Sequence, residues 1–264
     1  MGAGVSPRQL QDLLDSDHPP LVIDVRRSAI YFADAGIFAG ALRRDPDRVN
    51  AWAAELPQAS AVVVYCTYGH EVSQGVAGAL ERAGIAAHYL EGGFEAWKAA
   101  GGGLSAKPTG ASTRWVTRER PKIDRIACPW LIARFIDPEA RFFYVPTSSV
   151  LDSAAQENAT PYDIPDVAFS HVGEHCSFDA FLKAYRLRDP ALDQLALVVR
   201  GADTAKLDLA PQAAGLVAIS LGLSRRFPDD HEMLRHGMVI YHALYLWCKQ
   251  GRDEIHTWNP AAYR

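Results

Sequence analysis

The first hundred residues alternate short apolar runs with segments of helical periodicity. Apolar runs at 21–25, 61–66 and 86–90 have the length of buried strands. Apolar residues at helical spacing predict helices over 7–14, 45–55, 71–83 and 93–100, the first of them N-capped by Ser6. Strands that alternate with helices are typical of α/β domains with a central parallel sheet flanked by helices. The pattern predicts such a domain over residues 5–103.

The pattern changes after a segment rich in glycine and small polar residues. We expect residues 104–112 to form a flexible linker. Beyond it, strands are expected at 114–118, 141–145 and 167–171, and a long amphipathic helix from about 229 to 249. The prediction is a helix-rich α+β domain over 113–250, followed by a tail over 251–264.

Composition narrows the class of protein. The chain has 264 residues, which is enough for two hydrophobic cores, and its 48% hydrophobic and 22% charged content is ordinary for globular proteins. The sequence has neither a run that could span a bilayer nor a recognisable signal peptide, and its four cysteines are widely spaced, as in reduced thiols. We therefore expect a cytoplasmic protein without a membrane partner. Its net charge of −4 gives no general attraction to nucleic acid.

Cys66 stands at the point where an apolar run ends and a short loop leads to the helix predicted from residue 71. Backbone N–H groups of such a loop and the positive end of the helix favour the thiolate. Gly69 lies mid-loop, where a positive φ or a close backbone approach is expected. The pattern indicates a nucleophilic cysteine, with an inert buried cysteine as the alternative. The candidate loop comprises Thr67, Tyr68, Gly69, His70, Glu71, Val72 and Ser73.

Four blocks in this region resemble a single rhodanese domain. They are LVIDVR at 21–26, GA at 40–41, VVVYC at 62–66 and YLEGGFEAW at 89–97. The resemblance implies that Cys66 accepts a sulfane sulfur from a small-molecule donor as a persulfide and passes it to a thiol acceptor, without a cofactor. Asp24 and Arg26 match the acidic and basic pair of the family, and we expect them to form a structural ion pair.

The candidate loop departs from the pattern of rhodaneses that use thiosulfate. Many of those proteins place Arg or Lys after the loop glycine, whereas this chain has His70 and Glu71. A persulfide or a low-molecular-weight thiol donor is therefore favoured over thiosulfate. Phosphatase-like and arsenate-reductase-like relatives need an arginine six positions after the cysteine, and Val72 at that position argues against both activities.

Residues 113–250 carry a second resemblance. The blocks are WVTR at 115–118, PKIDRIACPWLI at 121–132, RFIDP at 134–138, SH at 170–171, CSFD at 176–179, RGAD at 200–203 and DH at 230–231. They resemble the C-terminal domain of the ChrB family of chromate-resistance proteins. The resemblance implies a role in chromate resistance, and several members are chromate-responsive regulators whose N-terminal part differs from this one. The alternative to a sulfurtransferase is thus a non-catalytic redox, persulfide or chromate sensor.

The second domain also gathers potential ligands and acid–base groups. The candidates are Asp124, Arg125, Cys128, His171, Glu174, His175, Cys176, Arg200, Asp203, Asp230 and His231. A mixed oxygen, nitrogen and sulfur metal site is one interpretation of this set. Alternatively, Arg118, Lys122, Arg125 and Arg200 bind an oxyanion of the chromate type, or they form a solvated basic face.

Residues 171–175 match the H-x-x-E-H pattern of some zinc proteases. In those enzymes both histidines lie on one face of a helix. Gly173 interrupts the helix that the pattern needs, and Ser177 is the expected N-cap of a helix that starts at Phe178. We therefore expect a loop here and reject the protease match.

Overall fold

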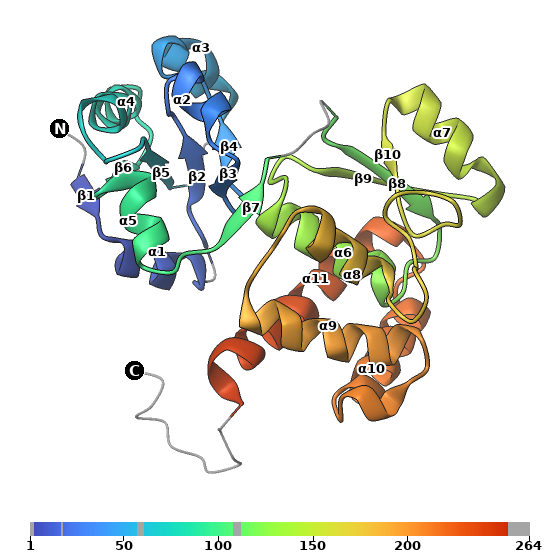
Figure 1. Ribbon diagram of the computed structural model, residues 1–264. Helices are drawn as coiled ribbons and strands as arrows, with labels where there is room; N and C mark the ends of the chain where they lie inside the picture. The colour runs from blue at the N-terminus through green and yellow to red at the C-terminus, as the bar shows by residue number, and fades with distance from the viewer. Residues whose placement is uncertain (1–2, 17, 57–60, 108–111, 253–264) are drawn as a thin grey trace.

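Five short strands of the N-terminal region pair into one parallel sheet, in the order β1-β6-β5-β2-β4 (Figure 1). The strands are β1 (Ala3–Val5), β2 (Leu21–Asp24), β4 (Leu42–Arg43), β5 (Val62–Tyr65) and β6 (Ala87–Leu90). The structure is a computed structural model that describes residues 3–16, 18–56, 61–107 and 112–252. Its central parallel sheet confirms the α/β class predicted for this region.

Alternating side chains of the central strand β5 face two separate cores. Val63 and Tyr65 point to a core that includes helices α1 (Pro7–Leu14) and α5 (Gly93–Ala99). Val62 and Val64 point to the opposite core, formed with α4 (Glu71–Arg82) and α3 (Val49–Trp52). The strand is therefore apolar throughout because both faces of the sheet are covered by helices.

One predicted helix of this domain is not a continuous α-helix. Residues 45–55 form a 3-10 turn, Pro46–Arg48, the single-turn helix α3 and a second 3-10 turn, Ala53–Glu55. The Trp52 indole N–H donates to the Asp45 carbonyl at 2.8 Å and holds the chain in this compact turn. The short helix α2 (Ser28–Ala33) is an element that the sequence pattern did not predict.

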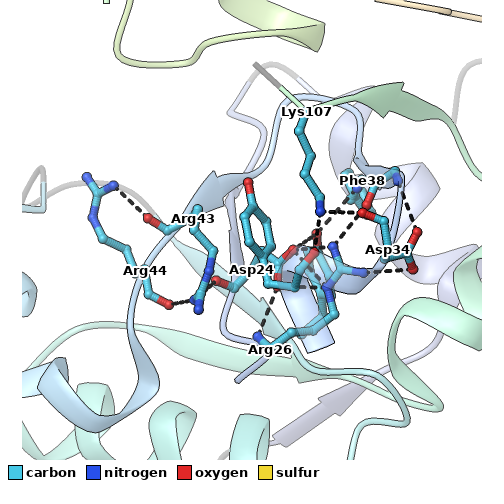
Figure 2. A network of polar contacts seen from close by, with 10 residues as sticks. Asp24, Arg26, Asp34, Phe38, Arg43, Arg44 and Lys107 are labelled. Carbon is cyan, nitrogen blue, oxygen red and sulfur yellow. Dashed lines mark hydrogen bonds and ion pairs between the residues drawn. The ribbon is translucent and has the colours of Figure 1, made fainter. Parts of the chain in front are cut away.

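The expected flexible linker begins with an ordered strand. Residues Leu104–Ala106 form β7, which pairs antiparallel with β3 (Gly36–Phe38) of the first domain. The Ala106 N–H also donates to the Tyr185 carbonyl of the second domain at 2.7 Å. Lys107 donates to the carbonyl oxygens of Tyr31 and Asp34 (Figure 2). This part of the linker is thus fastened to both domains, while residues 108–111 lie outside the described residues.

The second domain is helix-rich and is built around a small parallel sheet. Its strands β8 (Arg114–Arg118), β9 (Arg141–Val145) and β10 (Thr160–Pro161) pair in the order β10-β8-β9. Helix α7 (Val150–Glu157) packs on one face through Val116, Val150 and Ala154. The other helices form the main core: α6 (Asp124–Phe135), α8 (Ser177–Ala184), α9 (Pro190–Asp203), α10 (Ala213–Arg226) and α11 (Asp230–Leu246). Short 3-10 turns lie at Thr147–Ser149 and Leu207–Leu209.

The strand predicted at 167–171 is absent. Phe169 makes one isolated bridge with Tyr162, and its ring stacks on Phe181 with a centroid separation of 4.2 Å. The chain then turns tightly, with a backbone bridge between Val172 and His175. Packing of the Phe169 ring against α8 therefore replaces the extended pairing that the apolar run suggested.

The C-terminal end follows α11 through a π-helical turn, Trp247–Gly251. The rest of the predicted tail, residues 253–264, lies outside the described residues. Within the described ranges, every helix is too short or too polar to cross a membrane.

Asp24 and Arg26 form an ion pair in the core of the first domain (Figure 2). Both side chains are fully buried, and Arg26 Nη2 lies 2.6 Å from Asp24 Oδ2. Arg26 also donates to Asp34 and to the Gly36 carbonyl, both at 3.1 Å, and the Tyr65 hydroxyl donates to Asp24 at 2.8 Å. A buried charge pair is tolerated when its remaining lone pairs and protons are hydrogen-bonded in this way.

Replacing Arg26 should therefore destabilise the protein strongly. Arg26→Leu leaves the Asp24 carboxylate buried without its cation, and the expected loss is about 3–5 kcal/mol of unfolding free energy. Urea unfolding of the full chain, followed by circular dichroism, measures this loss as a lower midpoint. Arg27→Leu is the matched control, because the Arg27 side chain is 64% exposed and lies 3.7 Å from Asp47. Its expected effect is below about 1 kcal/mol, and equal midpoints for the two variants contradict the assignment.

Candidate functional site

Cys66 lies directly after β5, at the carboxyl end of the parallel sheet. The residue is 7% exposed, and its Sγ lies 3.2 Å from the Ser73 hydroxyl in the first turn of α4. Ser73 itself donates to the His70 carbonyl at 3.2 Å. The carboxyl end of parallel strands is where α/β proteins place their ligands, and the sulfur lies there beside a helix N-terminus.

Two glycines hold the Cys66 loop against the turn that follows β6. Gly69 has a φ of +73°, and a Cβ there would lie 2.5 Å from the Leu90 carbonyl oxygen. Gly93 has a φ of +61°, and a Cβ there would lie 2.4 Å from the Cys66 carbonyl oxygen. Phe94 donates its N–H to that carbonyl at 2.9 Å. Only residues without a Cβ permit this backbone contact, which confirms the close approach expected at Gly69.

The loop that follows Cys66 retains backbone N–H donors without an acceptor in the described protein. Among the described residues, none accepts a hydrogen bond from the N–H groups of residues 67–70. The N–H groups of residues 71–73 open α4, so they lack acceptors within the helix. Donors of this kind bind an anion at a helix N-terminus.

The outer side of the loop is aromatic and carries no fixed positive charge. Tyr68 is 58% exposed, and its ring centroid lies 6.0 Å from that of His70. Glu71 is exposed at the start of α4, and Val72 is half-buried. The Thr67 carbonyl accepts a hydrogen bond from the Glu95 N–H at 3.1 Å, so it connects the loop to α5.

In the second domain, three carboxylates converge on the ring of His171. The Nε2 atom of His171 lies 3.1 Å from Asp203, 3.5 Å from Asp124 and 3.5 Å from Asp163. Asp124 comes from the start of α6 and Asp203 from the end of α9, whereas His171 and Asp163 lie on loops. Three residues predicted from the sequence, Asp124, His171 and Asp203, thus meet at one place. We refer to Asp124, Asp163, His171 and Asp203 as the His171 cluster.

Asp163 is the member of the cluster that the sequence pattern did not predict. It follows the two-residue strand β10, has a φ of +54° and is 4% exposed. A strand so short has no periodic pattern, and nothing in its neighbourhood marks this aspartate apart from others. Its importance comes from contacts with residues distant in sequence.

Ser177 and two arginines hold the carboxylates of the cluster in place. The Ser177 N–H donates to Asp124 at 2.6 Å, and its hydroxyl donates to Asp163 at 2.8 Å. Arg118 and Arg125 both pair with Asp163 Oδ2, at 2.9 and 3.4 Å. Cys176, rather than the expected Ser177, is the N-cap of α8, so Ser177 is its first helical residue.

Burial and mutual proximity change the ionisation of the cluster. The interaction with Asp124 raises the pKa of His171 to about 9, against an opposing effect of burial. Burial, reinforced by the nearby carboxylates of Asp124 and Asp163, raises the pKa of Asp203 to about 7. At neutral pH the protonated His171 ring is therefore the positive charge at the centre of the three carboxylates.

Cys128 and Cys176 lie in the core of the second domain. Both are fully buried. Burial, together with the negative charge of Asp124, raises the pKa of each thiol above its usual range. They are therefore neutral thiols, and neither has the exposure of a reactive cysteine.

The remaining predicted residues of the second domain lie apart from the His171 cluster. Glu174 pairs with Lys206, His175 is exposed, and Arg200 pairs with Asp179 at 2.5 Å. Asp230 accepts from the Arg120 N–H at 3.1 Å, and the His231 ring packs edge-on against Tyr144. The loop expected at 171–175 is confirmed: the chain turns at Gly173, which has a φ of +61°. Each of three candidate oxyanion-binding residues, Arg118, Arg125 and Arg200, pairs with a carboxylate of the protein. These carboxylates offset the positive charge that would attract an oxyanion.

A cavity of about 780 Å³ lies between the two domains, away from both groups of candidate residues. Its lining includes Trp97, Trp130, Arg134 and Lys249. Arg134 and Lys249 both pair with Asp15, at 3.5 and 2.7 Å. These ion pairs join the two domains, and the cavity is part of the interface between them.

Comparison with solved structures gives rhodanese-like proteins. A rhodanese-related protein from Thermoplasma volcanium is 19% identical, covers 39% of this chain and 96% of its own, and has a TM-score of 0.34. A rhodanese-like domain protein from Staphylococcus aureus is 24% identical, covers 36% of this chain and 90% of its own, and has a TM-score of 0.33. The rhodanese-like domain from an Anabaena protein is 26% identical, covers 42% and 89%, and has a TM-score of 0.35.

Family models divide the chain as the two resemblances do. The model of the rhodanese-like domain matches residues 6–100. The model of the ChrB C-terminal domain matches residues 115–248, about half of the chain. Protein ChrB of Cupriavidus metallidurans is 32% identical over 135 residues, which are 50% of this chain and 40% of that relative. The chain belongs to the family of the ChrB C-terminal domain and carries a rhodanese-like domain ahead of it.

Proposed function

We propose that the protein is a sulfurtransferase in which Cys66 carries the transferred sulfur as a persulfide. The observation that supports this most directly is the Cys66 loop, where the sulfur lies beside the N-terminus of α4 and the loop keeps unused N–H donors. A persulfide on Cys66 is anionic, and these donors stabilise an anion without a metal or cofactor.

The proposed reaction has two displacement steps. The Cys66 thiolate attacks the sulfane sulfur of a donor persulfide, the sulfur–sulfur bond of the donor breaks, and the donor leaves as a thiolate. A thiolate acceptor then attacks the outer sulfur of the Cys66 persulfide, and Cys66 returns as a thiolate. The Ser73 hydroxyl lies 3.2 Å from Sγ and has one hydrogen, which turns from the His70 carbonyl to hydrogen-bond the sulfur when the sulfur is anionic. Each step exchanges one sulfur–sulfur bond for another, so no external oxidant or reductant is needed.

The outer side of the loop suggests the class of donor. The exposed Tyr68 ring offers an apolar contact, and Glu71 adds a carboxylate to the loop, whereas thiosulfate carries two negative charges. Negative charges repel one another, so Glu71 opposes the binding of thiosulfate. A persulfide of a low-molecular-weight thiol therefore fits the loop better than thiosulfate does.

The link to chromate resistance rests on the second domain, through its membership in the ChrB C-terminal family. A second candidate function is a persulfide or redox sensor that does not turn over. The observation in its favour is the combination of a carboxylate in the loop with a Cys66 that is 7% exposed. The experiments below distinguish the two functions.

Cys66→Ala should abolish sulfur transfer from a persulfide donor, such as glutathione persulfide, to cyanide. The wild-type protein should also gain about 32 mass units on incubation with the donor, and a reductant should remove them. Cys248→Ala is the control, because Cys248 is a buried cysteine outside the loop, and it should keep both properties. A folded wild type that gains the mass but does not transfer sulfur to any acceptor indicates the sensor instead.

Glu71→Arg should raise kcat/KM for thiosulfate. The change removes one negative charge and adds a positive one at an exposed position, which corresponds to about 1 kcal/mol and so to a rate increase of about fivefold. Glu81→Arg makes the same change on the same helix, about 15 Å away, where solvent ions screen it. An equal increase in both variants, or none in Glu71→Arg, removes the explanation.

Gly93→Ala should disturb the Cys66 loop directly. The added Cβ lies 2.4 Å from the Cys66 carbonyl oxygen, so the loop has to move, and persulfide transfer should fall at least tenfold. Gly84→Ala is the matched control, with a similar φ of +82° and no atom within 4 Å of the new Cβ. It should lower stability by about 1–2 kcal/mol and leave transfer unchanged. Equal rates for the two variants indicate that the loop contact does not shape the site.

A further inference from the structure

The His171 cluster is a site that sulfur transfer at Cys66 does not use. It lies in the second domain, and its four members come from α6, α9 and two loops. We propose that Asp124, Asp163 and His171 bind a divalent first-row transition-metal ion, with Asp203 beside them. The ion takes the place of the proton on His171 Nε2.

The separations between these side chains suit ligands of one shared ion. Two atoms that each lie about 2.1 Å from an ion are about 3.0 Å apart at a right angle and about 3.4 Å apart at the tetrahedral angle. His171 Nε2 lies 3.5 Å from Asp124 Oδ2 and 3.5 Å from Asp163 Oδ1. One ligand atom each from Asp124, Asp163 and His171 fall within 4.8 Å of one another.

Hydrogen bonding alone does not satisfy the cluster. A ring nitrogen carries at most one hydrogen, so His171 Nε2 donates to one carboxylate, and the two separations of 3.5 Å exceed the usual hydrogen-bond length of about 2.7–3.2 Å. Asp124 is 1% exposed, yet its Oδ1 accepts no hydrogen bond from any described residue. A buried carboxylate oxygen without a partner is rare in folded proteins. The other oxygen of this carboxylate, Oδ2, is the one that faces His171, so an ion held by both oxygens of Asp124 gives Oδ1 a partner.

The groups around the cluster hold the ligands in the way that metal sites require. Ser177 fixes Asp124 and Asp163 through its N–H and hydroxyl. Arg118 and Arg125 both pair with one oxygen of Asp163, Oδ2. The other oxygen, Oδ1, accepts the Ser177 hydroxyl and lies 3.5 Å from His171 Nε2. Such outer contacts orient ligands and are a regular feature of metal centres.

The ligand set indicates which ions fit. Carboxylates bind Mg²⁺ and Mn²⁺, whereas imidazole suits Zn²⁺, Fe²⁺ and similar ions. A set with one imidazole and carboxylates therefore favours Mn²⁺, Fe²⁺ or Zn²⁺ over Mg²⁺. The two nearest cysteines are neutral buried thiols, so a soft, sulfur-rich site is not formed.

The site is open on one side. The His171 side chain is 42% exposed, whereas Asp124 and Asp163 are buried beneath it. An ion can therefore enter past His171, and the exposed side leaves a coordination position for water or another ligand.

Isothermal titration of the full-length, tag-free, chelator-treated protein with Mn²⁺ and separately with Zn²⁺ tests the proposal. We expect one site per chain with at least one of these ions, a higher melting temperature in its presence, and at least tenfold weaker binding of Mg²⁺. His171→Ala should weaken binding at least tenfold and abolish the rise in melting temperature. The His171 side chain is 42% exposed, and circular dichroism checks that the variant folds.

His175→Ala is the matched control, because His175 is an exposed histidine on the same loop and its side chain lies outside the cluster. Its affinity should stay within about twofold of the wild type. Wild-type binding only at millimolar ion, unchanged binding in His171→Ala, or an equal loss in His175→Ala overturns the proposal. None of these results depends on Cys66, so they are independent of the outcome for sulfur transfer.

Discussion

The buried pair of Asp24 and Arg26 is the interaction on which the first domain depends. The guanidinium lies 4.2 Å from the centre of the Phe94 ring, and Phe94 in turn donates its N–H to the Cys66 carbonyl. The same guanidinium donates to Asp34 (Figure 2) and to the carbonyl of Gly36. Gly36 is the first residue of β3, which pairs with β7. A charge pair removed from water stabilises a fold only if it is fully hydrogen-bonded, and that requirement fixes the surrounding segments relative to one another. The ion pair thereby positions the turn that supports the Cys66 loop.

The second domain meets a comparable constraint with a different solution. Three aspartates lie close together, and the positive charges beside them come from His171, Arg118 and Arg125. Ser177 supplies two hydrogen-bond donors. The N–H of Ser177 is one of the groups that the first turn of a helix leaves without an acceptor. The start of α8 is thus used to bind carboxylates of the protein itself. The cation proposed for this cluster would offset the repulsion that these neighbouring carboxylates exert on one another.

The two domains are joined by specific contacts and not by the chain alone. Arg134 of α6 donates to the Leu14 carbonyl at 2.7 Å and pairs with Asp15, which also pairs with Lys249. Gly40 approaches the Arg134 carbonyl so closely that a Cβ would lie 2.2 Å from it. Strand β7 completes the connection, since it pairs with β3 and bonds to Tyr185 (Figure 1). The Cys66 loop and the His171 cluster are therefore held in one molecule as two separate sites.

The sequence by itself determined the parts of this protein that depend on local pattern. The parallel strands β2, β5 and β6, the helices α1, α4 and α5, and strands β8 and β9 follow from apolar periodicity and capping residues, because those signals lie within a few neighbouring positions. Cys66 with Gly69 was identifiable for the same reason, as was the turn at Gly173. Tertiary structure decided the rest. It placed Asp163 beside residues from three other segments, made β7 a strand through its pairing with β3, and replaced the expected strand at 167–171 by packing of Phe169. Those outcomes depend on contacts between segments distant along the chain, and no local pattern encodes such contacts.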